Sequence, residues 1–180
     1  STVVHLQVLG EHNVYNALAA AAAGYAAKLT LEQIKQGLEH AASESKRLIM
    51  QHTHCGAKVI DDSYNANPLS VAAAIDVVSQ QTNKKILVLG DMLELGNEEN
   101  ELHRSLGEQA KAKGIDAVFC FGPRTAYTAE GFGENAYHFS DQAELITELK
   151  KKIDKETTVL VKGSNSMRMD KVVQALVGKE

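Results

Sequence analysis

Four polar turns hold most of the residues in this sequence whose side chains suit ligand binding. Each turn follows an apolar run and combines small residues with acids, amides, hydroxyls or cations. The four turns are Asp61–Asn65, Gly90–Met92, Gly122–Arg124 and Lys162–Asn165. The carboxyl ends of parallel strands lie along one edge of a sheet, and ligands bind outside that edge. We therefore expect the four turns to form one polar rim.

The residue types of this rim suit binding better than covalent catalysis. The sequence has no Gly-x-Ser-x-Gly, no His-Glu-x-x-His, and no Gly-x-x-x-x-Gly-Lys followed by Ser or Thr. No Gly-x-Gly-x-x-Gly follows the first predicted strand, so a dinucleotide site is poorly supported. We expect a surface that binds a polar ligand without phosphoryl-transfer groups of its own.

Apolar runs predict the elements that carry these turns. Strands are expected over 47–52, 57–61, 85–89, 115–121, 136–139 and 157–161, and helices over 68–80, 98–113, 125–130, 141–153 and 169–176. Near-continuous Val, Ile and Leu indicate strands buried on both faces, and the short link at residues 54–56 indicates an antiparallel hairpin. Residues 43–180 are thus predicted to form an α/β, Rossmann-like domain. Its mostly parallel sheet is flanked by helices and has an antiparallel edge strand.

The first 42 residues have a different pattern. A strand is expected over 1–10, an Ala-rich helix over 12–28, and a second helix from a Thr30 cap to His40. Residues 41–45 show no helical or strand periodicity in their apolar positions, and we place a domain boundary there. Because the chain starts at Ser1 without Met and enters a strand-like run at once, we expect residues 1–42 to be a remnant of a larger domain.

Composition excludes several classes of partner. Of 180 residues, 44% are hydrophobic, and the net charge of -4 argues against a nucleic-acid or anionic-membrane surface. No apolar run approaches the roughly 20 residues of a membrane-spanning helix, so no membrane insertion is expected. Cys55 and Cys120 are far apart, without metal-ligand spacing, and are expected to be reduced thiols of a cytoplasmic protein.

Several segments resemble the Mur ligase family. Gly10–Ala17 is similar to the family's Gly-x-His-Asn-x-x-Asn-Ala signature, and Ser45–Leu48 to its Arg-bearing turn, although Lys46 replaces the usual glycine. Three further segments look like the branch of the family that adds D-alanyl-D-alanine. They are Asp61–Pro68 with Ser70, Gly90–Gly96 and Val161–Met167.

The resemblance implies an ATP-dependent amide ligase of cell-wall synthesis. ATP would phosphorylate a carboxylate of UDP-N-acetylmuramoyl-tripeptide, and the amine of D-alanyl-D-alanine would attack the acyl phosphate. The family's P-loop lysine and the groups that hold Mg²⁺ belong to a central ATP-binding domain. We therefore expect this chain to have no catalytic or metal-binding residues of its own and to be inactive alone. The parent enzyme is expected to be monomeric.

The resemblance also implies roles for individual residues. Asn13 and Asn16 would contact the adenosine of ATP, Arg47 its phosphates, and Asp62 its ribose hydroxyls. The expected contacts of the dipeptide are Tyr64, Asn65, Asn67, Asp91, Lys162 and Ser164.

Structural roles and other functions remain open at this point. Asn13 and Asn16 could simply cap a helix. Arg47 could be a solvent-exposed charge on an edge strand, and Lys162 could be a charged residue at the solvent-exposed edge of the sheet. His103 lies within a charged helix and is expected at the surface. The alternative functions are another Mur-type or folylpolyglutamate-type ligase, and a non-catalytic Rossmann-like binding module.

Overall fold

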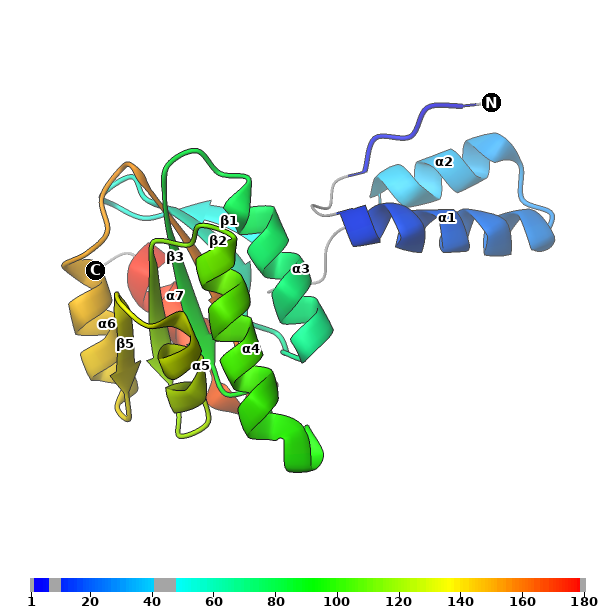
Figure 1. The fold of residues 1–180 in the computed structure, drawn as a ribbon. Coiled ribbons are helices and arrows are strands. Elements are labelled where there is room, and N and C mark those ends of the chain that lie inside the picture. Colours follow the sequence, from blue (N-terminus) through cyan, green and yellow to red (C-terminus); the bar gives the residue numbers. More distant parts are fainter. Residues whose placement is uncertain (1, 7–10, 41–47, 179–180) are drawn as a thin grey trace. The chain divides into compact units, whose positions relative to one another are not determined.

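The computed structural model describes residues 2–6, 11–40 and 48–178. The chain divides into two compact units, Ser1–Glu44 and Ser45–Glu180 (Figure 1). Within the described ranges, no helix combines the length and the apolar character needed to cross a bilayer.

The first unit contains two helices, α1 (Glu11–Ala26) and α2 (Leu31–His40). The predicted start of α2 is confirmed, because Gln33 N–H donates to Thr30 Oγ1 at 3.3 Å while Thr30 N–H donates to Gln33 Oε1 at 2.9 Å. This reciprocal pair satisfies backbone donors that a helix start leaves open.

The strand predicted at the chain start is wrong for residues 2–6, which form no regular element. The backbone N–H of His5 donates to the Glu39 carboxylate at 3.0 Å instead of to a neighbouring strand. Residues 7–10 of that prediction lie outside the described residues.

The second unit contains a six-stranded sheet of order β1-β2-β6-β3-β4-β5. Only β1 is antiparallel, paired with β2, while the other neighbours run parallel. This confirms the predicted α/β fold with its antiparallel edge. The strands are β1 (Ile49–His52), β2 (Lys58–Asp62), β3 (Lys84–Gly90), β4 (Ala117–Phe121), β5 (Ala136–Phe139) and β6 (Thr157–Lys162).

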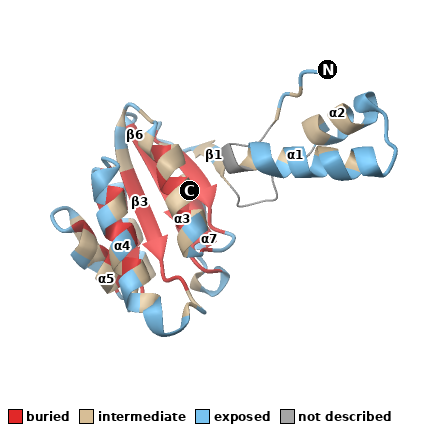
Figure 2. Cartoon of the chain, turned by 45° about the vertical axis from the view of Figure 1, so that its right-hand side comes forward, coloured by how far each residue is buried: buried red, intermediate tan, exposed pale blue. Residues whose placement is uncertain are grey.

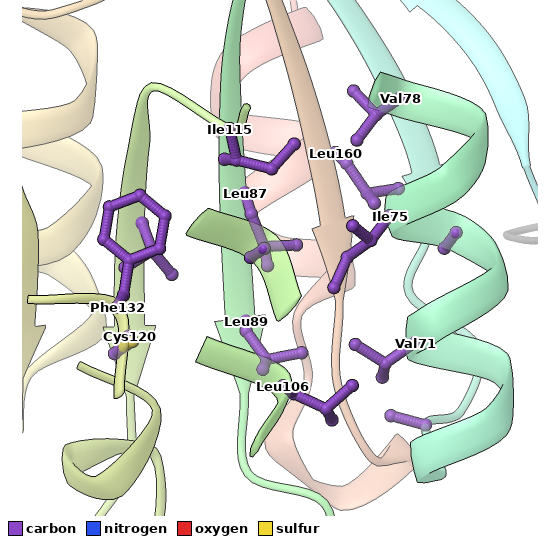
Figure 3. Packing of buried hydrophobic residues seen from close by; sticks show 14 of the residues in the cluster. Val71, Ile75, Val78, Leu87, Leu89, Leu106, Ile115, Cys120, Phe132 and Leu160 are labelled. Carbon is purple, nitrogen blue, oxygen red and sulfur yellow. The ribbon is translucent and has the colours of Figure 1, made fainter. Parts of the chain in front are cut away.

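Helices cover both faces of this sheet and bury a separate apolar core on each. The helices are α3 (Pro68–Ser79), α4 (Glu99–Ala112), α5 (Thr125–Phe132), α6 (Gln142–Lys150) and α7 (Asp170–Val177), with short 3-10 turns at Gly96–Glu98 and Asn165–Met167. One core lies under α3, α4 and α5 (Figure 3). The other lies under α6 and α7. The central strands β3 and β6 are consequently buried along almost their whole length (Figure 2).

Local residues explain where these helices begin and end. Asn67 caps α3, with Pro68 in the first turn, and the Asp141 carboxylate caps α6 by accepting from Glu144 N–H at 2.8 Å. Gly114 follows α4 with a φ of 73°, a conformation that costs glycine little. These boundaries agree with the predicted ones to within a few residues, except that α6 ends at Lys150 rather than near residue 153.

Cys120 lies in the core under α3, α4 and α5. Its side chain is fully buried, and burial together with the nearby charge of Asp91 raises the pKa of its thiol. A buried, protonated thiol behaves as a small apolar group.

Candidate functional site

The four predicted polar turns are joined by contacts at the carboxyl edge of the sheet. Lys162 Nζ, at the end of β6, lies 2.6 Å from Asp62 Oδ2 at the end of β2. Ser164 N–H donates to the carbonyl of Asp91 after β3, at 3.0 Å. The Asp91 carboxylate accepts in turn from Arg124 N–H, after β4, at 3.0 Å. The four predicted turns therefore form one connected polar rim, and the residues that connect them are largely buried.

Asp62 and Lys162 form a buried ion pair. They are direct partners in the β2–β6 register, and their side chains are only 11% and 3% exposed. Burial raises the pKa of the Asp62 carboxyl, and the Lys162 ammonium opposes part of that rise. Lys162 Nζ also donates to the Asn65 carbonyl at 2.8 Å. Lys162 thus holds both the strand end and the turn that follows it.

The turn after β2 presents three side chains to solvent. Tyr64, Asn65 and Asn67 are all exposed, and Tyr64 is 42% exposed. Local bonds fix the backbone beneath them, since Asn65 Oδ1 accepts from Ala66 N–H at 2.9 Å and Asn67 Oδ1 from Ser70 N–H at 2.8 Å. Of the six expected dipeptide contacts, these three are the accessible ones.

Asp61 and Asp62 point to opposite faces of the sheet, as expected for neighbours on a strand. Asp61 Oδ1 accepts from Ser63 N–H at 3.1 Å and from Ser63 Oγ at 2.6 Å. Asp61 therefore shapes the turn, whereas Asp62 is tied to the neighbouring strand.

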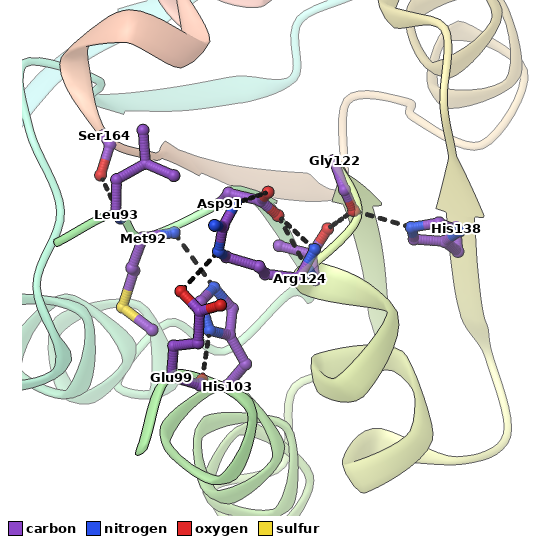
Figure 4. A network of polar contacts seen from close by, with 10 residues as sticks. Asp91, Met92, Leu93, Glu99, His103, Gly122, Arg124, His138 and Ser164 are labelled. Carbon is purple, nitrogen blue, oxygen red and sulfur yellow. Dashed lines mark hydrogen bonds and ion pairs between the residues drawn. The ribbon is translucent and has the colours of Figure 1, made fainter. Parts of the chain in front are cut away.

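Asp91 is buried in a network that organises the loops after β3 and β4 (Figure 4). Its Oδ1 accepts from the N–H groups of Arg124 and Thr125, at 3.0 and 2.8 Å, where α5 begins. A carboxylate at a helix N-terminus is favoured by the helix dipole. Gly122 makes room for it, because a Cβ there would lie 2.6 Å from the Asp91 carboxyl carbon.

Arg124 connects this network to α4. Its Nε donates to Glu99 Oε2 at 2.6 Å, and this bond and charge raise the pKa of the already basic guanidinium. Sequence reasoning identified the turn that contains Arg124 but not its ion pair. The pair joins residues 25 positions apart, and no local period reveals such a contact.

The prediction that His103 lies at the surface is wrong, because its side chain is fully buried. Its Nε2 accepts from Met92 N–H at 3.0 Å, and its Nδ1 donates to the Glu99 carbonyl at 2.7 Å. One signal in the sequence could have shown this. His103 shares a helix face with Leu106 and Ala110, which are also buried.

The expected nucleotide contacts fall in different parts of the chain. Asn13 and Asn16 lie on α1 in the first unit, where Asn16 Nδ2 donates to Asn13 Oδ1 at 3.1 Å. Asp62 belongs to the second unit, and Arg47 lies outside the described residues.

Comparisons with known proteins identify a matching family and similar sequences. The family described as Mur ligase, glutamate ligase domain, matches residues 46–165. The UDP-N-acetylmuramoyl-tripeptide--D-alanyl-D-alanine ligase of Escherichia coli (strain K12) is 43% identical over 180 residues, covering 98% of this chain and 39% of that protein.

Two solved structures are similar in fold. MurF from Acinetobacter baumannii superposes with a TM-score of 0.90 at 35% identity, covering 99% of this chain and 40% of that one. The MurF ligase of Thermotoga maritima in complex with ADP has a TM-score of 0.82 at 23% identity, over 93% of this chain and 38% of that one. This chain therefore spans about two fifths of the length of these relatives.

Proposed function

This chain belongs to the Mur ligase family, and we propose that it supplies the acceptor-binding part of a ligase that adds D-alanyl-D-alanine to UDP-N-acetylmuramoyl-tripeptide. One observation carries the proposal. The three segments that resemble this branch of the family, although separated in sequence, contact one another at a single rim. Lys162 contacts Asp62 and the Asn65 carbonyl, and Ser164 contacts Asp91.

The chemistry of the exposed turn suits a short peptide. D-Alanyl-D-alanine presents an amine, an amide and a carboxylate, and it has only methyl side chains. The amides of Asn65 and Asn67 can both donate and accept hydrogen bonds, and Tyr64 adds a hydroxyl beside an apolar ring. Asp91, Lys162 and Ser164 are largely buried. In our proposal they hold the backbone that presents the exposed side chains.

In the proposed reaction, ATP activates the tripeptide carboxylate as an acyl phosphate, and the bound dipeptide amine attacks it. Asn13, Asn16, Arg47 and Asp62 are the proposed nucleotide contacts. The T. maritima ligase was solved with ADP, which makes ATP the nucleotide to test. Among the described residues, no group of three His, Cys, Asp or Glu side chains could hold a metal ion. We propose, as the family resemblance implies, that Mg²⁺ is held by parts of the ligase outside this chain.

The same proposal assigns the two parts of this chain to domains of the ligase and describes the enzyme to which they belong. Residues 1–42 would belong to the central ATP-binding domain and residues 43–180 to the acceptor-binding domain, in a cytoplasmic, monomeric enzyme. Most of the tripeptide substrate would then contact parts of the ligase that lie outside this chain.

A titration followed by NMR tests the acceptor site. Adding D-alanyl-D-alanine to the isotope-labelled chain should shift the amide resonances of residues 64–67, while L-alanyl-L-alanine should leave them nearly unchanged. The Asn65→Ala variant should bind more weakly by about tenfold, as expected for one lost hydrogen bond to a charged or polar ligand group. Asn100→Ala, an exposed change on α4, is the matched control. No shift at millimolar dipeptide, or an equal response to both stereoisomers, would contradict the proposal.

A further inference from the structure

We propose that His103 is a positioning residue, which fixes the turn after β3 in the conformation that holds Ser164 and the rest of the rim in place. The link to dipeptide binding rests on the proposed function. The positioning itself is a property of the ligand-free chain and can be tested separately.

The hydrogen bonds of His103 define its protonation state. The Glu99 carbonyl can only accept, so the Nδ1 atom that lies 2.7 Å from it carries a proton. The Met92 backbone N–H can only donate, so the Nε2 atom that lies 3.0 Å from it carries none. His103 is therefore neutral, in the tautomer protonated at Nδ1, with both ring nitrogens used.

Three consecutive residues of the turn after β3 are held from two sides. Met92 N–H donates to His103, while the Asp91 carbonyl and Leu93 N–H bond to the backbone N–H and the hydroxyl of Ser164, at 3.0 and 2.9 Å. Figure 4 shows His103 and Ser164 on opposite sides of this turn. Because the Met92 N–H is buried, losing its acceptor would favour a different backbone path.

The held turn is connected to the exposed part of the rim. Ser164 begins the 3-10 turn Asn165–Met167, and Asn165 Nδ2 donates to the Tyr64 carbonyl at 3.0 Å. A path of hydrogen bonds and covalent neighbours thus runs from His103 through Met92, Leu93, Ser164 and Asn165 to the turn that presents Tyr64. An apolar side chain at position 103 could fill the same volume, but it could not make the first of these contacts.

The charged groups near His103 have partners other than its imidazole ring. They are Asp91 and Arg124 on the loops that face α4, and Glu99 in the first turn of α4 itself. Glu99 and Arg124 are paired with each other at 2.6 Å, and Asp91 is bound by two backbone N–H groups. His103 therefore supplies a hydrogen-bond acceptor within a network whose charges already have partners.

Amide hydrogen exchange in the ligand-free chain tests the positioning. His103→Leu removes the acceptor, and His103→Gln places a carbonyl oxygen where it can accept from Met92 N–H. Leu106→Ala, a change in the same helix and core, is the control for lost stability. The two variants are compared at matched global stability. The backbone amide hydrogens of Met92, Leu93 and Ser164 should exchange at least about tenfold faster in His103→Leu than in Leu106→Ala. His103→Gln should retain most of the protection.

Exchange in His103→Leu no faster than in the control would overturn the positioning role. If His103→Leu does not fold, the protonation of the two His103 ring nitrogens in the unmodified chain tests the positioning role instead. Their ¹⁵N resonances must show Nδ1 protonated and Nε2 not, and the opposite tautomer overturns the proposal.

Dipeptide binding tests the link to function. The dissociation constant for D-alanyl-D-alanine should rise about tenfold in His103→Leu and stay within about threefold in His103→Gln and Leu106→Ala. If His103→Leu binds the dipeptide as well as Leu106→Ala does, the link is wrong. If the unmodified chain binds no dipeptide, the proposed function fails, and the exchange experiment alone decides the role of His103.

Discussion

At the residue scale, Lys162 shows how a side chain expected to touch a ligand can instead hold the site together. The sequence placed it at a strand end beside glycine, where an exposed cation would suit an anion. In the structure its ammonium group is directed at Asp62 and the Asn65 carbonyl, and its side chain is 3% exposed. We expect it to act on any ligand through the turn that it holds.

Replacing Lys162 with Met should therefore lower stability and make that loss depend on pH. Removing one partner of a buried pair costs about 3 kcal/mol, since the remaining charge stays buried. Burial already raises the pKa of Asp62, and losing Lys162 raises it further. A carboxyl whose folded pKa is raised favours folding below its unfolded pKa and loses that contribution as pH rises through the folded pKa. The defect should be largest at pH 7 and smaller near pH 4.

Urea unfolding of the two proteins at both pH values measures this difference. The double change Asp62→Asn with Lys162→Met is the control, and it should recover much of the loss at pH 7. An equal defect at both pH values would show that Asp62 is not the group left without a counter-charge.

At the scale of elements, the packing of α4 against α5 depends on two glycines. A Cβ on Gly107 would overlap the Thr128 carbonyl of α5, and a Cβ on Gly131 would overlap the Arg104 carbonyl of α4. The two helix backbones are thus in direct contact. Both helices carry parts of the Asp91 network, since α4 begins at Glu99 and α5 at Thr125. Their spacing therefore affects the rim.

Forcing atoms into a packed interface costs about 1–3 kcal/mol, and we expect the upper end of that range here because the Cβ would overlap a backbone carbonyl. The gain in helix propensity, about 1 kcal/mol, acts in the opposite direction, so Gly107→Ala should destabilise the second unit by about 2 kcal/mol. Thermal unfolding measures the change. Ser105→Ala, an exposed change in the same helix, should have little effect. A Gly107→Ala protein as stable as this control would mean that the helices can separate without penalty.

The elements of the second unit could be predicted because each has a local cause. Continuous Val, Ile and Leu marked the buried strands, and Pro68, Asp141 and Gly114 marked helix ends. The strand order could not be predicted this way. β6, the last strand in sequence, lies between β2 and β3, and this position depends on contacts among distant segments.

The position of the polar rim could be predicted for the same reason, whereas the roles of its residues could not. The polar turns follow directly from where strands end, so the rim was expected correctly as a place. The role of His103 depends on the buried Met92 N–H, whose need for an acceptor arises only once the turn after β3 has formed. Likewise, the Asp91 carboxylate binds the start of α5, 33 residues or more away, and no local pattern in the sequence reveals a contact of that range.

At the scale of the whole molecule, ion pairs limit what two cations of the described rim can do for a phosphoryl group. Stabilising a transferring phosphoryl group needs positive charge directed at its oxygens. Lys162 is paired with Asp62, and Arg124 with Glu99, each at 2.6 Å. These two cations are therefore already neutralised by carboxylates, and redirecting either one would leave a carboxylate without its partner. Lys162 and Arg124 are therefore poorly placed to stabilise a transferring phosphoryl group.

We therefore expect the purified chain to release no ADP above background when given ATP, Mg²⁺, D-alanyl-D-alanine and UDP-N-acetylmuramoyl-tripeptide, even at concentrations where the dipeptide binds. A coupled assay of ADP release measures this, with the Asn65→Ala chain prepared in parallel. A trace of contaminating ligase would give equal rates in both preparations. Turnover that scales with the amount of chain and falls in Asn65→Ala would show that these 180 residues activate the carboxylate themselves. In that case one of the two ion pairs must open during the reaction, and Lys162, which lies beside the proposed acceptor turn, would be the cation to examine first.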